Sequence, residues 1–367
     1  MNIEIIEVFS FLRQLGFAVA GAAALWGFVF LFFARHKEGL RCNVFTWIGR
    51  RLSFLFFGGS FIAAVALVGL YFFTPVFAHE GIVIVAEHDD IQAALAALKP
   101  WYGLWALITL FGLGAWMFAR EFFNTTLHWF YLLQFVATFL LISFPAWTGE
   151  FNSIQAFFAG HSFHSIFTFG TVIVLDFLFI SSLGSNVLKQ HIYPYFPTIS
   201  KVIWVGLGFD FLSVALVFDE AIRLTAKFFF MQTVIGILII NGTILSGILT
   251  RKMLRSVQDG AVPLTKRWTT IANIAGTISV SSWFTITFLD SFEGLLFGYW
   301  QFVLGYVLLI VTLYIAHMVS EYFHVEKFPV LAYTGGECSL HSPRPRQWIQ
   351  TFRTVARALL SRLVKKK

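Results

Sequence analysis

Nine long apolar runs constrain the fold of this 367-residue chain more than any other feature of its sequence. Each run is about 20 residues long, the length at which a helix crosses a hydrocarbon layer of roughly 30 Å. Charged residues make up 12% of the chain, against about 25% in a soluble domain, so the composition excludes a soluble protein. The sequence predicts an all-α, polytopic membrane protein with transmembrane helices at Leu12–Ala34, Leu52–Phe73, Trp101–Ala119, Leu127–Trp147, Ser162–Leu183, Val202–Phe218, Phe228–Thr250, Trp268–Leu289 and Phe297–Val319.

Lysine and arginine are unevenly distributed between the loops. Most of the 26 basic residues fall in alternate connections, above all 35–51 and 251–267, and in the tail. Basic loops stay on the cytoplasmic side, so we expect the amino terminus outside, the carboxyl terminus in the cytoplasm and a plasma-membrane location. The net charge of +7 then reflects asymmetry across the bilayer and indicates no nucleic-acid partner. Cys42 and Cys338 both fall on the reducing side, so no structural disulfide is expected.

The runs divide the chain into two blocks of four spans and a ninth span. We expect one four-helix bundle over residues 1–150, a second over 151–296, the ninth helix over 297–324 and a cytoplasmic tail over 325–367. The outer loop predicts a strand-like segment at Ile82–Val85 and a short helix capped by Asp89 or Asp90. The tail predicts a basic amphipathic helix on the anionic lipid of the inner leaflet, with a stripe of Trp348, Phe352, Val355, Leu359 and Leu363.

The two blocks resemble each other. At one constant offset, Gly21 meets Gly170 and Gly59 meets Gly208, and the loop lengths and basic patches follow the same order. This pattern predicts a tandem repeat whose copies have the same orientation in the membrane. The polar residues belong to the second copy, so we expect a structural role for the first and a functional role for the second: His164, Asp176 and Asp210 match Leu15, Gly27 and Phe61.

Two carboxylates fall at membrane depth, where an ionisable side chain is costly and indicates function. At about 1.5 Å per residue, Asp210 lies roughly 12 Å and Asp176 roughly 20 Å from the outer face. Asn241 falls near the depth of Asp176, and Ser282 near that of Asp210. These four residues predict a proton or ion path, or polar support for a cofactor. The alternative is that each aspartate is protonated and only joins two helices by a hydrogen bond.

Histidines form a second group of candidates. His161 and His164 begin the fifth span three residues apart, so both can ligate a metal or a haem from one helix face. The outer loop adds His79 and His88, and these four histidines with nearby carboxylates predict a zinc or copper site. The alternative is hydrogen bonding to lipid headgroups.

Two further histidines, His128 and His317, fall near the inner ends of the fourth and ninth spans and are candidate axial haem ligands.

The second block also carries a family pattern. His164 precedes small residues through Gly170 and Thr171, a basic loop follows, the next helix opens at Ser200-Lys201 and another enters after Lys227. This arrangement resembles the four-helix module of the CopD-like group of bacterial membrane proteins, related to protoporphyrinogen oxidase of the HemJ type. The resemblance implies a haem or copper ligand at His164. The chain lacks the usual Gly-Gly after that histidine.

Three functions remain open at this point. The first is a redox or metal-handling membrane protein whose second bundle binds haem b or copper near the outer face. The second is a transporter or channel for a proton or small solute, which would use Asp210, Asp176 and Asn241. The third is a non-catalytic subunit that docks into a larger membrane complex. The sequence contains no HExxH, GxSxG, CxxC or P-loop motif, and whether the chain is an enzyme stays open.

Overall fold

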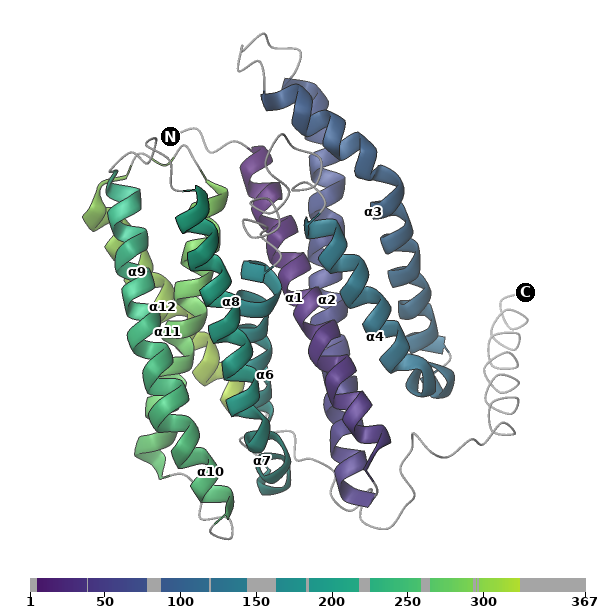
Figure 1. Cartoon of the computed structure of the whole chain (residues 1–367), viewed down its shortest axis with the longest axis vertical. Helices are drawn as coiled ribbons and strands as arrows, with labels where there is room; N and C mark the ends of the chain where they lie inside the picture. The colour runs from purple at the N-terminus through teal and green to yellow at the C-terminus, as the bar shows by residue number, and fades with distance from the viewer. Residues whose placement is uncertain are drawn as a thin grey trace, which may run out of the picture.

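A computed structural model describes residues 5–37, 39–77, 87–118, 120–143, 163–182, 185–217, 225–258, 265–292, 295 and 297–323. The described chain is all-helical, and its long helices run side by side along the long axis of the molecule (Figure 1). One group contains α1 (Ile5–Arg35), α2 (Gly39–Phe77), α3 (Glu87–Phe118) and α4 (Arg120–Ser143). The other group contains the π-helix η2 (Phe163–Gly170), α6 (Thr171–Ser182), α7 (Asn186–Ile192), the 3-10 turn η3 (Tyr193–Tyr195), α8 (Phe196–Val217), α9 (Ala226–Thr243), the π-helix η4 (Ile244–Leu249), α10 (Thr250–Gln258), α11 (Lys266–Ser291) and α12 (Tyr299–Phe323).

Over the part of the chain that the structure describes, each predicted apolar run falls within one helix or within consecutive helical segments, although α2 and α3 begin well before their runs. Among the described residues, six helices are long and apolar enough to cross a membrane, and two shorter apolar helices, Pro100–Ala115 and Leu127–Ile142, accompany them. The prediction of a helical, multi-pass membrane protein is confirmed at this level.

The helix α2 begins much earlier than predicted. It starts at Gly39, so the basic stretch before Leu52 is helical and not a loop. Arginine is a good helix former, and Arg51 lies 5.1 Å from the centre of the Trp47 ring one turn before it, which is a cation–π contact. The basic connection expected at 35–51 is therefore mostly the first turns of α2.

The expected short helix of the outer loop is not separate either. It is the first part of α3, which runs from Glu87 through Pro100 into the apolar segment without a break. The strand-like segment Ile82–Val85 and the amphipathic tail helix lie outside the described residues.

The structure differs from the sequence prediction at Cys42. This residue is fully buried at the start of α2 and takes part in a disulfide bond. The expectation that no structural disulfide forms is therefore wrong in this structure. Cys338 lies outside the described residues.

Small residues bring the helices of the first group close together. A Cβ atom placed on Gly16 of α1 would lie 2.6 Å from the Gly59 carbonyl oxygen of α2, and one on Gly59 would lie 2.7 Å from the Ala20 nitrogen. No side chain fits between these backbones, which is the packing that small residues allow between membrane helices.

The helix α1 also holds the two groups together. Gly170 of η2 packs against the backbone of Ala18, because a Cβ atom there would lie 2.2 Å from the Ala18 carbonyl oxygen. The Trp26 indole donates a hydrogen bond of 3.2 Å to the Thr171 hydroxyl of α6. The Gln14 amide donates to Ser165 of η2 at 3.4 Å and accepts from Ser291 of α11 at 3.1 Å.

The short helix α7 and the turn η3 close one end of the interface between the groups. The Tyr195 ring of η3 packs edge-on against Phe30 of α1 and Phe45 of α2, with centroids 5.7 and 5.4 Å away. Leu188 and Ile192 of α7 are fully buried in the same apolar cluster. This end of the molecule, the lower end in Figure 1, is called the α7 end below.

Candidate functional site

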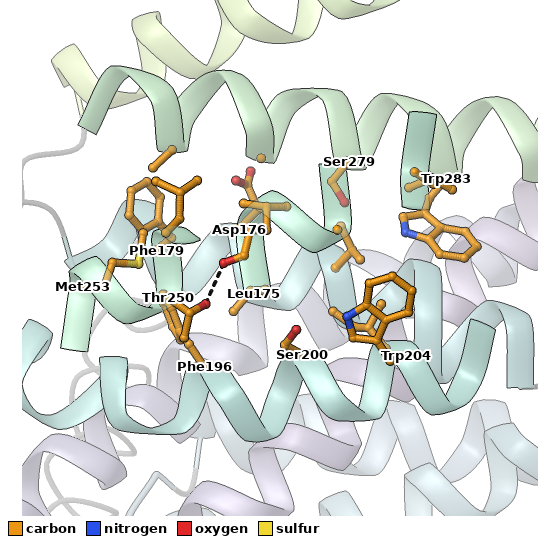
Figure 2. Close-up of a pocket in the computed structure, with 18 of the residues that line it drawn as sticks. Leu175, Asp176, Phe179, Phe196, Ser200, Trp204, Thr250, Met253, Ser279 and Trp283 are labelled. Carbon is orange, nitrogen blue, oxygen red and sulfur yellow. Dashed lines mark hydrogen bonds between the residues drawn. The ribbon is translucent and has the colours of Figure 1, made fainter. Parts of the chain in front are cut away.

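A cavity of about 90 Å³ lies between α6, α8, α11 and the α9–η4–α10 segment of the second group. A buried water needs roughly 10–15 Å³ of such space, and pockets for drug-sized ligands begin near 300 Å³. The cavity therefore suits a few waters or one small ion. Figure 2 labels Leu175, Asp176, Phe179, Phe196, Ser200, Trp204, Thr250, Met253, Ser279 and Trp283 among its lining residues.

Asp176 is the carboxylate of this cavity. It is half-buried on α6, and its side chain lies beside α11 (Figure 2). A Cβ atom placed on Gly276 of α11 would lie 2.9 Å from Asp176 Oδ1. The absence of a side chain at Gly276 thus makes the space that the carboxylate occupies.

Hydroxyl groups provide the other polar lining of the cavity. Ser279 lies one turn beyond Gly276 on α11, and Ser200 of α8 lies on the opposite wall (Figure 2). Apolar and aromatic side chains form most of the remaining wall. In such surroundings a carboxylate has few groups that replace its hydration, so water or a bound cation within the cavity would stabilise its charge.

A stretch of π-helix, η4, borders the cavity next to Thr250. The Thr250 hydroxyl donates a hydrogen bond of 2.8 Å to the Leu245 carbonyl, five residues earlier (dashed line in Figure 2). The same contact occurs in η2, where Thr171 donates to the Ile166 carbonyl at 2.9 Å. In both cases the threonine directly after the π-helix donates a hydrogen bond to a carbonyl within it. Such helices occur frequently at functional sites.

Asn241 lies at the level of Asp176, as the spacing of the sequence predicts. Its side-chain amide donates a hydrogen bond of 2.8 Å from α9 to the Ala275 carbonyl of α11, which is the residue before Gly276. Asn241 thereby fixes α9 against α11 beside the carboxylate. Its contact is the helix-joining hydrogen bond that the alternative interpretation expected for polar residues at this depth.

Ser282 belongs to a different interface. Its hydroxyl is bonded to the Ile278 carbonyl at 2.7 Å and to the Tyr306 hydroxyl of α12 at 2.7 Å. It does not line the cavity that contains Asp176. The structure therefore brings Asp176 and Asn241 together, while Ser282 joins α11 to α12.

His317 is the buried histidine of α12. It is 6% exposed, although Ile315, Met318 and Val319 around it are about half exposed. Its Nε2 atom is buried and has no hydrogen-bond partner among the described residues. The imidazole interacts electrostatically with Asp176, so the ninth helix contributes a group to the surroundings of the cavity.

His128 lies in the first group and has a different partner. Its Nε2 atom is 2.8 Å from Nη1 of Arg35. Because a guanidinium only donates hydrogen bonds, Nε2 is the acceptor and its lone pair is occupied. This contact leaves no free Nε2 lone pair for an axial haem ligand in the described arrangement.

The remaining candidates cannot be placed as side chains. His164 begins η2 and Asp210 belongs to α8, but their side chains lie outside the described residues, as does that of His88 on α3. His79 and His161 are outside the described residues altogether. Within the described part of the chain, no three His, Cys, Asp or Glu side chains lie close enough together to hold a metal ion. Haem b or copper binding stays a prediction, which an absorption spectrum with metal analysis of the purified protein would test.

Three residues of the site were not found from the sequence. Gly276, Ser200 and Thr250 border the carboxylate or its cavity. A signal for the first was present, because Gly276 interrupts the hydroxyl-rich helix that faces Asp176. The other two give no sequence signal, since serine and threonine are common in membrane helices and only the folded arrangement brings them to one cavity.

Comparison with protein-family models, with curated proteins and with solved structures finds no match for this chain. Its function has to follow from its own side chains.

Proposed function

We propose that this protein translocates protons or a small monovalent cation across the membrane, with Asp176 as the carboxylate that binds the transported ion. The observation that carries the proposal is an acidic side chain in the wall of a cavity that lies between helices of the second group. Ionisable residues in membrane helices mark ion pathways and proton relays, because their burial is too costly for packing alone.

The size and lining of the cavity favour a small ion over an organic solute. Its volume of about 90 Å³ accommodates a few waters. Asp176, Ser200 and Ser279 offer oxygen atoms to an ion or to its water. Divalent cations require six or more oxygen ligands, or a tightly held water shell. A proton or a monovalent ion makes a smaller demand.

Asp176 can exist in two states in these surroundings. The neutral carboxylic acid is compatible with the apolar wall, whereas the carboxylate requires water or a cation beside it. Binding and release of a proton therefore switch the side chain between a neutral acid that the apolar wall tolerates and a carboxylate that requires water in the cavity. This alternation is the elementary step of a proton relay.

The proposed topology has nine spans in the plasma membrane, with the amino terminus outside. Basic side chains collect at the α7 end, where Arg50 and Arg51 begin the apolar part of α2 and Arg251 and Lys252 follow η4. The Lys252 ammonium lies 5.4 Å from the centre of the Trp268 ring. Basic and aromatic residues together are typical of a cytoplasmic membrane interface. The tail would bind anionic lipid on this side.

The proposed tandem repeat finds support in the contact between α1 and η2. Gly21 faces the Ile166 side chain, with a Cβ atom placed there 2.8 Å from Cδ1, and Gly170 faces Ala18. These two glycines occupy matching positions in the two blocks and contact each other's helix. A pseudo-two-fold axis along the membrane normal produces such reciprocal contacts between parallel repeats.

Proton flux into vesicles tests the proposal. The full-length protein is reconstituted into lipid vesicles that contain a pH-sensitive dye, and a potassium diffusion potential drives the flux. Because the relay loses its acid, we expect Asp176→Asn to lower the flux by about 100-fold or more. Glu7→Gln neutralises a carboxylate near the start of α1 and is the matched control, with flux close to that of the unaltered protein.

Two outcomes would contradict the proposal. One is that vesicles with the protein take up protons and monovalent cations no faster than vesicles without it. The other is an Asp176→Asn protein that conducts as well as Glu7→Gln at the same protein-to-lipid ratio.

A further inference from the structure

His317 is a buried polar residue on a helix that is mostly exposed. Only 17% of the apolar core of α12 is buried inside the protein, yet His317 is 6% exposed. Its Nε2 atom has no hydrogen-bond partner in the described structure. An unpaired buried polar atom costs free energy. This cost suggests that His317 is kept for a function and not for packing.

The register between α11 and α12 places His317 near Asp176. The two helices are antiparallel and are joined by the hydrogen bond between Ser282 and Tyr306. Counting the same number of residues from that bond along both helices brings His317 level with Ile271, roughly 7 Å beyond Gly276 at 1.5 Å per residue. Helix side chains tilt toward the helix amino terminus, which directs the imidazole back toward the level of Gly276.

Gly276 lies on α11, the helix that both groups approach. Asp176 approaches it from the side of the cavity, and α12 packs on the same helix. The electrostatic interaction between His317 and Asp176 agrees with this arrangement. The imidazole therefore lies behind α11, closer to the α7 end than the carboxylate is.

We infer that the transported ion is a proton and that His317 receives it from Asp176 on the route to the α7 end. This inference rests on the proposed function and names its substrate and its second relay group. The proton leaves the carboxyl O–H of Asp176 and reaches Nε2 of neutral His317 through an intervening water molecule, which leaves a carboxylate and an imidazolium. The imidazolium then gives a proton to water at the α7 end, and the neutral ring is restored.

The other charged groups of the neighbouring helices lie toward the helix ends. Lys266 and Arg267 begin α11, Lys227 begins α9, and Lys201 lies near the start of α8. The side chain of Asp210 on α8 is outside the described residues. Within the described part, Asp176 and His317 are thus the pair that can exchange a proton in the interior of the second group.

The same vesicle assay tests the inference. Because one relay group is lost, we expect His317→Gln to lower proton flux at least about tenfold and to change its pH profile between pH 5 and 8, where histidine titrates. In His317→Ala, added imidazole should restore much of the flux, which a purely structural role would not allow. His191→Gln is the control, because His191 hydrogen-bonds the Val187 carbonyl of its own helix α7.

The outcomes separate the two proposals. Full flux in Asp176→Asn would overturn both. Loss of flux in Asp176→Asn, together with unchanged flux and an unchanged pH profile in His317→Gln, would overturn the histidine step alone. His317→Ala could also lose flux because it unfolds, which thermal unfolding would show. If added imidazole then does not restore the flux, and His317→Gln folds and conducts normally, the relay is overturned.

Discussion

In each of the two helix groups a glycine on one helix packs against a larger side chain on another, but the glycine lies on a different helix in each group. In the first, Gly27 of α1 faces the Tyr131 ring of α4, since a Cβ atom on the glycine would lie 2.5 Å from the ring. In the second, Asp176 of α6 faces Gly276 of α11. Gly27 and Asp176 are the positions that the proposed repeat aligns. The glycine thus lies on α1 in the first group and on α11 in the second.

At these two contacts a buried ring occupies the space in the first group, whereas a cavity lies beside the carboxylate in the second. The Tyr131 hydroxyl is fully buried, donates to the Gly49 carbonyl at 2.7 Å and accepts from Ser53 at 2.8 Å. Every polar atom of that side chain is satisfied, as a stable interior requires. The carboxylate of Asp176 instead lines an open space. Under the proposed function, the first group supports the second, which contains the ion-binding carboxylate.

The largest effect is expected from removal of the Tyr131 ring. Because Tyr131→Ala leaves a large void and two unpaired polar groups, it should lower the free energy of unfolding by about 3–5 kcal/mol. Trp129→Ala is the control, since Trp129 lies on the same helix and is 60% exposed. Unfolding in mixed detergent measures both. Equal losses in the two variants would show that Tyr131 does not support the first group.

Alanine substitutions at Gly27 and Gly276 should separate an effect on stability from an effect on function. Gly27→Ala presses a methyl group against the confined Tyr131 ring and should cost about 1–3 kcal/mol of stability. Gly276→Ala meets the end of the Asp176 side chain, which can turn into the cavity. We therefore expect little loss of stability but about a tenfold loss of proton flux, because the carboxylate no longer faces α12.

The control for both is Gly236→Ala on α9, where a Cβ atom meets nothing within 4 Å. It should be neutral in unfolding and in flux. The comparison would be broken if Gly276→Ala and Gly27→Ala had the same effect on both measurements.

The sequence predicted the helices and the shared level of Asp176 and Asn241 well. Apolar runs determine where helices can cross a bilayer, and a constant rise per residue places Asp176 and Asn241 at one level. The contacts of Gly27 with Tyr131 and of Asp176 with Gly276 could not be predicted from the sequence. Each pair joins helices far apart in the sequence, and only the packed structure brings their faces together.

The errors have physical reasons too. The basic stretch before Leu52 was read as a loop because charge was equated with a connection, although arginine is a good helix former. The sequence predicts a separate short helix near Asp89, whereas the structure continues this helix through Pro100 into the apolar segment of α3. Ser282 was assigned to the path of Asp176 from its depth, but it faces Tyr306. Depth alone does not show which side of a helix a residue occupies.

A smaller effect is expected at the contact between the groups, and it depends on pH. Burial raises the pKa of Tyr193, which precedes Tyr195 in η3, to about 12. In the unfolded chain it ionises near pH 10. The stabilisation is complete below pH 10 and is lost as the pH rises toward 12, on the order of 1 kcal/mol. Tyr193→Phe keeps the stacking on Phe179 and should lose less stability over this range, as unfolding at pH 9, 10 and 11 would show.

The protonation of Asp176 itself tests the central claim most directly. Infrared difference spectra of the reconstituted protein, recorded as the pH is changed, detect the carbonyl stretch of a protonated carboxyl group. The account predicts a band that disappears in Asp176→Asn, remains in Glu7→Gln and changes its pH dependence in His317→Gln. An unchanged spectrum in Asp176→Asn would show that this carboxylate does not bind the proton, and it would contradict the account.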